Sequence, residues 1–274
     1  MAWHTDDMHE LIDSHSHLDV SEFDADRDAV VDRARAAGVS RQIIPAISRA
    51  GFENLKSLCC EVDGLFPAYG MHPIYLDDHR SGDIEHLAEW LQRERAVAVG
   101  ECGLDFYVEG LDLVRQREIF DAQLELAKDL DLPVIVHALR AVEDVIMALR
   151  RVGGLRGVVH SYGGSAEQAQ RLWEMGFHIG VGGPVTYERA RRLREIVASM
   201  PIEFLLLESD APDQPLSTHR GARNEPAYLV EVLDVVASLR NADPAEVAAA
   251  TSRNAVELFR LPATPQACVG GPRT

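Results

Sequence analysis

Long apolar runs are missing from this 274-residue sequence, which nowhere contains the roughly 18 consecutive apolar residues of a membrane-spanning helix. Cysteine is scarce as well, with four residues that form no C-x-x-C pair and no secreted-scaffold spacing. Met1–Glu10 shows no basic segment followed by an apolar core, so no export signal is expected. These absences favour a protein without a membrane span that works in the reducing cytoplasm.

Positive charge is also in short supply. Lys and Arg number 27 against 44 Asp and Glu, which gives a net charge of −17 and a pI near 5.0. Non-specific wrapping of nucleic acid is excluded, because that binding depends on Lys and Arg displacing counterions. An enzyme whose local positive charge comes from metal ions stays possible.

Apolar residues make up 46% of the chain, enough for the large core of an enzyme-sized globular protein. Short β-branched or apolar runs alternate with amphipathic helical stretches, which indicates repeated βα units around a parallel sheet. The expected strands are Leu11–His17, Gln42–Ile47, Phe66–His72, Ala96–Glu101, Pro133–His137, Gly157–His160, Phe177–Val181 and Phe204–Asp210. Expected helices include Arg27–Ala37, Ile84–Gln92, Gln116–Leu130, Ala141–Arg150, Ala166–Met175, Tyr187–Met200, Pro226–Arg240 and Pro244–Phe259.

Eight βα units predict a TIM (β/α)8 barrel. An open doubly wound sheet is disfavoured, because no strand runs into a G-x-G-x-x-G turn. We expect residues 1–274 to form one domain, with the barrel over about 10–261 and a Pro/Gly-rich, flexible tail over 262–274.

The expected strand ends carry the residues that point to chemistry. Because side chains alternate along a strand, His15 and His17 should face the same side. In an α/β barrel the carboxyl ends of the strands meet on one rim, so the two histidines should be joined there by the other strand-end residues Glu101, His137, His160 and Asp210.

That set exceeds what one tetrahedral zinc ion takes, and it predicts a two-metal site with a shared carboxylate. Glu101 is the expected bridge, and Asp210 is expected to bind metal and to accept a proton from the attacking water. Some members, taken singly, also fit simpler roles. A His-x-His pair also occurs by chance on half-buried strands, His137 alone fits a hydrogen-bonded core histidine, and Asp210 fits a helix cap before Ala211.

Several motifs resemble those of the TatD family of metal-dependent hydrolases, in the family's order and across about residues 10 to 261. They are Asp-Ser-His-Ser-His-Leu-Asp at 13–19, Gly-Met-His-Pro at 70–73, Gly-Glu-Cys-Gly-Leu-Asp-Phe-Tyr at 100–107, Pro-Val-Ile-Val-His at 133–137, Val-Val-His-Ser-Tyr-Gly-Gly-Ser at 158–165, Leu-Glu-Ser-Asp-Ala-Pro-Asp at 207–213 and Arg-Asn-Glu-Pro-Ala-Tyr-Leu at 223–229. Taken together they are highly specific.

The resemblance implies an amidohydrolase-type barrel with two divalent ions (Mg²⁺, Mn²⁺ or Zn²⁺) that cleaves phosphodiesters, typically as a deoxyribonuclease. It implies that His15, His17 and Asp210 bind the first metal, that Glu101 bridges, and that the second metal is held by His137 and His160.

The resemblance also bears on substrate contacts. His72 would lie near a substrate phosphate, although a structural turn before Pro73 accounts for it equally well. Leu139 stands where the family commonly has an Arg, so Arg140 would have to reach the phosphate from another angle. Tyr162 replaces a usual Phe and adds a hydroxyl near the rim.

Residues around this set have expected roles of their own. Arg220 and Arg223 are expected either to guide the phosphate backbone or to belong to a plain solvated loop. As hydrogen-bond acceptors, three carboxylates are expected to orient imidazoles: Asp13, Asp105 and Glu208. Two further features are expected to be structural: Cys102 as a buried thiol and residues 189–194 as a solvated helix face. Glu225 resembles a family position, and a helix N-terminal carboxylate explains it equally well.

The function expected from the sequence is therefore that of a TatD-type deoxyribonuclease, with DNA as substrate. Two alternatives use the same residues. One is hydrolysis of another ester or an amide, such as an aminoacyl-tRNA or a lactone, and the other is a metal-binding scaffold without turnover. The scaffold is disfavoured, because storage would not require Asp210 as a base beside the metal site.

Overall fold

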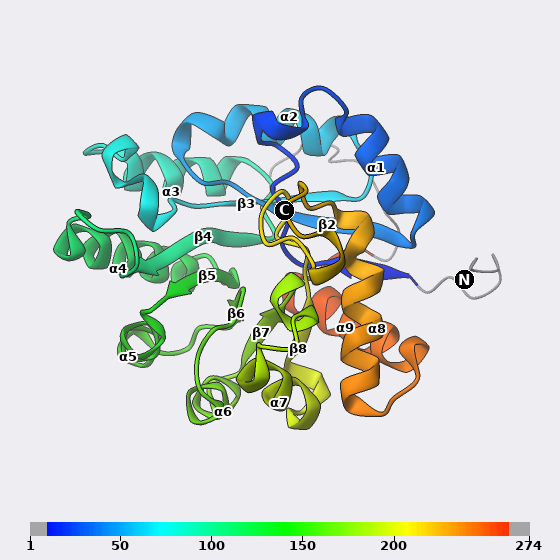
Figure 1. Cartoon of the computed structure of the whole chain (residues 1–274). Coiled ribbons are helices and arrows are strands. Elements are labelled where there is room, and N and C mark those ends of the chain that lie inside the picture. Colours follow the sequence, from blue (N-terminus) through cyan, green and yellow to red (C-terminus); the bar gives the residue numbers. More distant parts are fainter. Residues whose placement is uncertain (1–9, 263–274) are drawn as a thin grey trace.

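The computed structural model describes residues 10–262 and shows a parallel barrel ringed by helices (Figure 1). Neighbouring strands pair in parallel in the order of the sequence, which confirms the predicted TIM barrel. The strands are β1 Leu11–Asp13, β2 Val39–Pro45, β3 Leu65–Tyr69, β4 Ala98–Asp105, β5 Val134–Leu139, β6 Gly157–Val159, β7 Phe177–Val181 and β8 Leu205–Leu207. Backbone hydrogen bonds from Ser14 N to Leu207 O (3.0 Å) and from Asp210 N to His15 O (2.9 Å) join the first strand to the last.

Helices follow the strands and cover the outside of the barrel (Figure 1). They are α1 Arg27–Ala36, α2 Phe52–Glu61, α3 Asp83–Arg93, α4 Leu113–Asp129, α5 Val142–Val152, α6 Ala166–Glu174, α7 Arg191–Ser199, α8 Leu229–Arg240 and α9 Pro244–Phe259. Their starts follow local chemistry: Ser165 and Gln168 form a capping box on α6, and Asp243 caps α9 ahead of Pro244.

Two helices differ from the expectation. The helix α2 was not among the expected ones, although Phe52, Leu55 and Cys59 recur on its buried face at helical spacing. The helix α7 begins at Arg191 rather than at Tyr187. The preceding residues form a short 3-10 helix, Gly183–Thr186, and the Tyr187 hydroxyl donates to Pro215 O at 2.9 Å.

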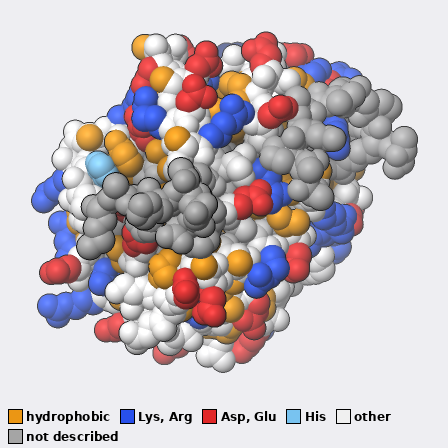
Figure 2. Space-filling model, turned by 90° about the vertical axis from the view of Figure 1, so that its right-hand side faces the viewer, with side chains coloured by type: hydrophobic (Ala, Val, Ile, Leu, Met, Phe, Trp, Pro, Cys, Tyr) orange, Lys and Arg blue, Asp and Glu red, His pale blue; other side chains and the backbone are white. Residues whose placement is uncertain are grey.

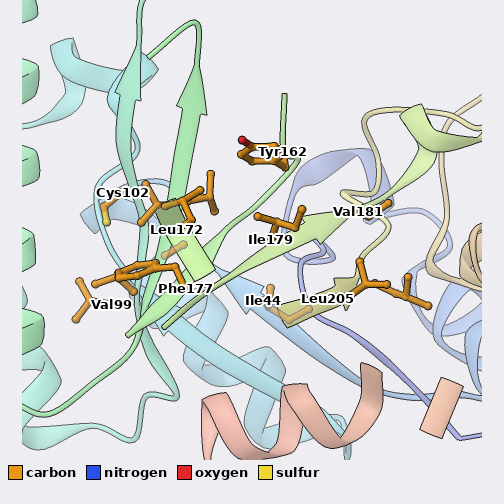
Figure 3. Close-up of a cluster of buried hydrophobic side chains, with 14 of the residues drawn as sticks. Ile44, Val99, Cys102, Tyr162, Leu172, Phe177, Ile179, Val181 and Leu205 are labelled. Atoms are coloured by element: carbon orange, nitrogen blue, oxygen red, sulfur yellow. The ribbon is translucent and has the colours of Figure 1, made fainter. Parts of the chain in front are cut away.

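Apolar side chains on the two faces of the strands build two clusters. The larger cluster lies between the strands and the outer helices, as Figure 3 shows for Phe177, Ile179 and Val181 of β7. The smaller cluster fills the barrel interior, where Ile43, Ile135 and Leu206 pack with Leu258 and Phe259 of α9. Because α9 closes the interior at the amino ends of the strands, the carboxyl ends are left to carry the site.

Charged side chains of both signs are mixed over the face shown in Figure 2. Within residues 10–262, the structure has no helix that combines the length and the apolar character needed to span a bilayer. The predicted flexible tail falls almost entirely on residues 263–274, which lie outside the described residues.

Candidate metal centre

The His-x-His pair lies just beyond β1, which ends at Asp13, two residues before the first histidine. The predicted strand was therefore too long, but the backbone beyond it still forms hydrogen bonds to segments on both sides. Ser16 N donates to Ile43 O (3.1 Å) and His17 N donates to Ala211 O (2.8 Å). The two imidazoles converge as expected, with 3.1 Å between the Nε2 atoms of His15 and His17.

Glu101 lies inside β4 rather than at its end, because that strand continues to Asp105. The register between β4 and β5 shifts between Val99 and Cys102, as at a β-bulge. A bulge re-aims side chains, and here the Glu101 carboxylate lies buried among imidazoles, with the side chain 1% exposed. Position 100 in this bulge requires glycine, since a Cβ there would stand 2.8 Å from both the backbone oxygen and the side chain of Ile135.

The two oxygens of Glu101 divide the histidines into two groups. Oε2 lies 3.1 Å from His15 Nε2 and 3.4 Å from His17 Nε2. Oε1 lies 2.7 Å from His160 Nε2 and 3.1 Å from His137 Nδ1. Oε2 thus faces two imidazole nitrogens, and Oε1 faces two others together with His72 Nε2 at 3.0 Å.

Asp210 completes the first group. Its Oδ1 lies 3.6 Å from His15 Nε2 and 3.8 Å from His17 Nε2. The residue follows β8 at a φ of +57°, a left-handed conformation that non-glycine residues adopt at a cost and that is common at functional sites. A helix cap does not account for Asp210, because no helical segment begins at this position.

Hydrogen bonds assign opposite tautomers to two rings that face Glu101 Oε1. His137 Nε2 lies 2.8 Å from Asp105 Oδ2, so this nitrogen donates, and Nδ1 is the nitrogen that can bind a metal ion once it has lost its proton. His72 Nδ1 accepts from Ile74 N at 3.2 Å, so its Nε2 carries the proton that points to Glu101 Oε1 at 3.0 Å. His72 therefore offers a hydrogen-bond donor, whereas His137 offers a ligand atom.

Burial and mutual charge shift the pKa values of these groups. Burial opposes the charge on Glu101, but the fields of His160, His72 and His15 outweigh it and hold its pKa well below the usual range. Burial opposes protonation of His160 and His17 too, yet Glu101 raises their pKa values to about 10 and about 9. Desolvation raises the pKa of Asp210 against the opposing fields of His160 and His17, which moves this carboxylate towards the range of a base.

A cavity of about 630 Å³ opens over the centre, and its wall includes Glu101, His137, His160 and Asp210. Arg140 and Arg192 also line it. Arg140 has a φ of +56° and places its guanidinium 4.6 Å from the centre of the Tyr107 ring. Arg192 donates to Gly163 O at 2.7 Å, so the helix face expected to be merely solvated contributes a cation to this wall.

Arg223 is held away from the cavity by two carboxylates. Its guanidinium donates to both oxygens of Asp26 at 2.8 and 2.7 Å and to Glu225 at 3.1 Å. It also lies 4.5 Å from the centre of the Phe23 ring, and it is absent from the described residues that line the cavity. This ion-paired arginine is therefore neither in position to contact a phosphate in the cavity nor part of a plain solvated loop. The Glu225 carboxylate pairs with Arg223 and Arg33 and does not act as a helix N-terminal carboxylate.

The three carboxylates expected to orient imidazoles differ in what they do. Asp105 holds His137 as expected. Asp13 instead accepts from the backbone N–H groups of His15 (3.2 Å) and Ser209 (2.9 Å), so it ties β1 to β8. Glu208 Oε1 accepts from Ser161 N and lies 3.9 Å from His160 Nδ1, beyond hydrogen-bond distance.

Two other side chains near the rim are turned elsewhere. Cys102 is buried, and its Sγ lies 3.6 Å from Ile135 O. The Tyr162 side chain is buried as well, and its hydroxyl donates to Ser165 O at 2.7 Å (Figure 3). The added hydroxyl therefore closes the loop before α6 and does not line the cavity.

The donor set fits divalent metal ions. Imidazole nitrogens with free lone pairs and carboxylate oxygens are the ligands that zinc and manganese take. Two groups, His15 with His17 and Asp210, and His15 with Glu101 and His160, bring potential ligand atoms within 4.8 Å of one another. A third such group contains His72, whose tautomer makes it a donor instead.

A parallel barrel that gathers histidines and carboxylates at one rim is typical of metal-dependent hydrolases. The model of the family "TatD related DNase" matches residues 12–260. The chain belongs to this family.

Relatives match over almost the whole chain. The metal-dependent hydrolase YjjV of Escherichia coli K12 is 41% identical over 92% of this chain and 98% of its own length. The crystal structure of that protein, a TatD homologue, superimposes with a TM-score of 0.89 at 39% identity and the same coverage. A protein of Erwinia tasmaniensis named 3'-5' ssDNA/RNA exonuclease TatD is 34% identical over 92% of this chain and 100% of its own length.

Proposed function

We propose that this hydrolase holds two divalent ions and cleaves phosphodiester bonds of nucleic acid, with DNA as the expected substrate. The observation that carries the proposal is the division of the imidazoles between the two oxygens of Glu101. One group, His15, His17 and Asp210, would hold the first ion, and His137 with His160 would hold the second.

When bound, divalent ions in such a centre acidify a water molecule and neutralise charge that develops on the reacting phosphoryl group. The protein supplies the proton transfer: Asp210 Oδ1 faces the centre, and desolvation raises its pKa, so this oxygen accepts the proton of the attacking water. His72 Nε2–H donates towards the same space, where it can bind a phosphoryl oxygen.

The cavity wall carries two arginines, Arg140 and Arg192, beside carboxylates such as Glu143 and Asp144. The Arg140 guanidinium lies over the Tyr107 ring. We propose that Arg140 contacts the phosphate backbone from this wall, in place of the family's usual Arg at position 139, and that Arg192 joins it. The name of the Erwinia relative supports nucleic acid as the substrate class.

The test is metal-dependent turnover on end-labelled single-stranded DNA, double-stranded DNA, RNA and a carboxylic ester, with Asp210→Asn as the matched variant. We expect DNA cleavage with Mg²⁺ or Mn²⁺ and a loss of at least about 100-fold in kcat for Asp210→Asn, the usual size of a general-base contribution. Hydrolysis of the ester without cleavage of any nucleic acid would refute the proposed substrate. Metal analysis that finds one ion at saturating supply would refute the bridge at Glu101.

A further inference from the structure

The two oxygens of Asp210 lie in different surroundings. Oδ1 faces His15 and His17 of the metal centre, whereas Oδ2 accepts a hydrogen bond from Gln214 Nε2. We propose that Gln214 is a positioning residue, which holds Oδ2 so that Oδ1 alone is presented to the centre and to the attacking water. The inference rests on the role of Asp210 in the proposed function, and it applies to any substrate that this centre hydrolyses.

The Gln214 amide can face Asp210 in only one orientation. An ionised carboxylate is purely an acceptor, so the amide nitrogen must point to it, because a flipped amide would set two acceptor oxygens against each other. The Ser161 hydroxyl bonds to the same amide: it accepts from Gln214 Nε2 at 2.5 Å and donates to Gln214 Oε1 at 2.8 Å. The carboxylate therefore fixes the direction of the bond from Gln214 to Asp210, and Ser161 holds the amide that makes it.

Both ends of this chain of hydrogen bonds are themselves held. Ser161 has a φ of +47°, and its backbone N–H donates to the buried carboxylate of Glu208. On the other side, the buried Asn224 donates from Nδ2 to Ser209 O at 2.7 Å and to Asp213 O at 2.9 Å. Asn224 thus clamps the loop that carries both Asp210 and Gln214.

The loop geometry places Gln214 where a side chain of this length is needed. Gln214 has a φ of +52°, and its backbone oxygen would stand 2.1 Å from a Cβ on Gly183, so the loop packs directly on the short 3-10 helix that follows β7. Without the amide donor, the Asp210 carboxylate can rotate about its Cβ–Cγ bond, out of the plane in which a single oxygen is aimed at the centre. Such rotation lowers the fraction of enzyme with a correctly aimed base and leaves substrate binding largely intact.

The decisive variant is Gln214→Met, which keeps the length of the side chain and removes its hydrogen bonds. Wild type and variant are loaded with Mn²⁺ and assayed on bis(4-nitrophenyl) phosphate, single-stranded DNA and 4-nitrophenyl acetate. On each substrate that the wild type turns over, we expect kcat to fall about tenfold while KM changes less than about twofold. The metal content should stay unchanged.

Gln170→Met is the matched control. Gln170 is exposed on α6 and bonds only to Glu174 in the described structure, so the same substitution should leave kcat within about twofold of the wild-type value. If Gln214→Met does not fold, Ser161→Ala is the second variant, because it removes the donor to Gln214 Oε1. We expect it to give a smaller fall in kcat with the same KM.

A double-mutant cycle separates positioning from a general structural role. In the Asp210→Asn background, Gln214→Met should have little further effect on the residual kcat, because residues that act as a unit are not additive. The inference would be overturned by additive losses in kcat, by an unchanged kcat in Gln214→Met, or by a loss of kcat that excess Mn²⁺ restores. Cleavage of the model diester or the ester without cleavage of DNA would refute only the proposed substrate, since the ratio of variant to wild-type kcat is still measured.

Discussion

Hydrogen atoms decide which histidines can bind metal. His137 and His72 both approach Glu101 Oε1, at 3.1 and 3.0 Å, and distance alone does not distinguish them. Their second ring nitrogens do: the one on His137 donates to Asp105, and the one on His72 accepts from Ile74. The first ring is thereby prepared to bind a cation and the second to bind an anion, such as a phosphoryl oxygen.

Asp105→Asn tests this assignment. Asp105 Oδ1 accepts from Tyr107 N (2.8 Å) and Val108 N (2.9 Å), and Asn keeps that oxygen while placing its amide nitrogen at His137. Because a donor then faces Nε2, His137 must protonate Nδ1 and loses its ligand atom. We expect metal affinity to fall about 10- to 100-fold, measured by competition with a chromophoric chelator.

Asp121→Asn is the control for that measurement, because Asp121 is a partly exposed carboxylate that pairs with Arg151 on the outer helices. Unchanged metal affinity in Asp105→Asn would show that His137 does not depend on Asp105 for its tautomer.

Metal binding should release protons. The pKa values of His17 and His160, about 9 and about 10, mean that both rings are protonated near neutral pH in the metal-free protein. A ring must lose its proton to bind metal, so about two protons should leave at pH 7, and apparent affinity should rise with pH until it reaches these pKa values. Calorimetry in buffers of different ionisation enthalpy counts the protons; binding without release would contradict the raised pKa values.

Strand ends, and the residues just past them, set the geometry of the site. Three residues there have left-handed backbone conformations: Arg140 after β5, Ser161 after β6 and Asp210 after β8. Such conformations are maintained only where the surrounding structure enforces them. Here buried side chains such as Asp13, Glu208 and Asn224 bond to neighbouring backbone groups and provide that support.

Gly180→Ala should disrupt this arrangement at the end of β7. A Cβ on Gly180 would stand 2.0 Å from Glu208 Oε2, and Glu208 is buried with little room to move. We expect a loss of about 1–3 kcal/mol in the free energy of unfolding, measured by urea denaturation, together with a fall in kcat because Glu208 releases Ser161. Gly51→Ala is the matched control, since a Cβ at Gly51 meets nothing within 4 Å; equal stability of both variants would contradict the packing described.

At the scale of the whole molecule, the centre connects distant parts of the barrel. The residues proposed to hold the ions come from β4 and β5 and from the segments that follow β1, β6 and β8. Ions bound there would link strands from opposite sides of the barrel, and they have no equivalent site in the unfolded chain. Bound metal should therefore stabilise the entire fold, in addition to its role in catalysis.

Chelation should lower the melting temperature. An ion present at about 1,000 times its Kd contributes about 4 kcal/mol to stability, and each kcal/mol corresponds to roughly 2–4 °C in a chain near this size. We expect EDTA to lower the Tm by about 10 °C and added Mn²⁺ or Zn²⁺ to restore it, as followed by circular dichroism. The variant Glu101→Gln should lose most of this metal-dependent shift; the same Tm with and without EDTA in the wild type would show that the ions do not stabilise the fold.

The barrel was predictable because each βα unit carries its own periodicity. Apolar runs of the right length alternate with amphipathic helices, and the end of each run marks the rim of the barrel. Strand boundaries were less accurate: β1 ends before His15, whereas β4 continues past Glu101 through a bulge. A bulge depends on pairing with a distant strand, which local sequence does not report.

The sequence by itself determined the βα order, and with it that His15, His17, Glu101, His137, His160 and Asp210 lie in or just after strands whose carboxyl ends meet on one rim. Tertiary structure alone decided which ring nitrogen faces inward, which imidazoles each oxygen of Glu101 faces, and that Arg223 is held by Asp26 while Arg140 lines the cavity. It also brought Gln214 to Asp210. The physical reason is that residue types follow the periodicity of the local chain, whereas hydrogen-bond partners and rotamers depend on packing between segments far apart in sequence.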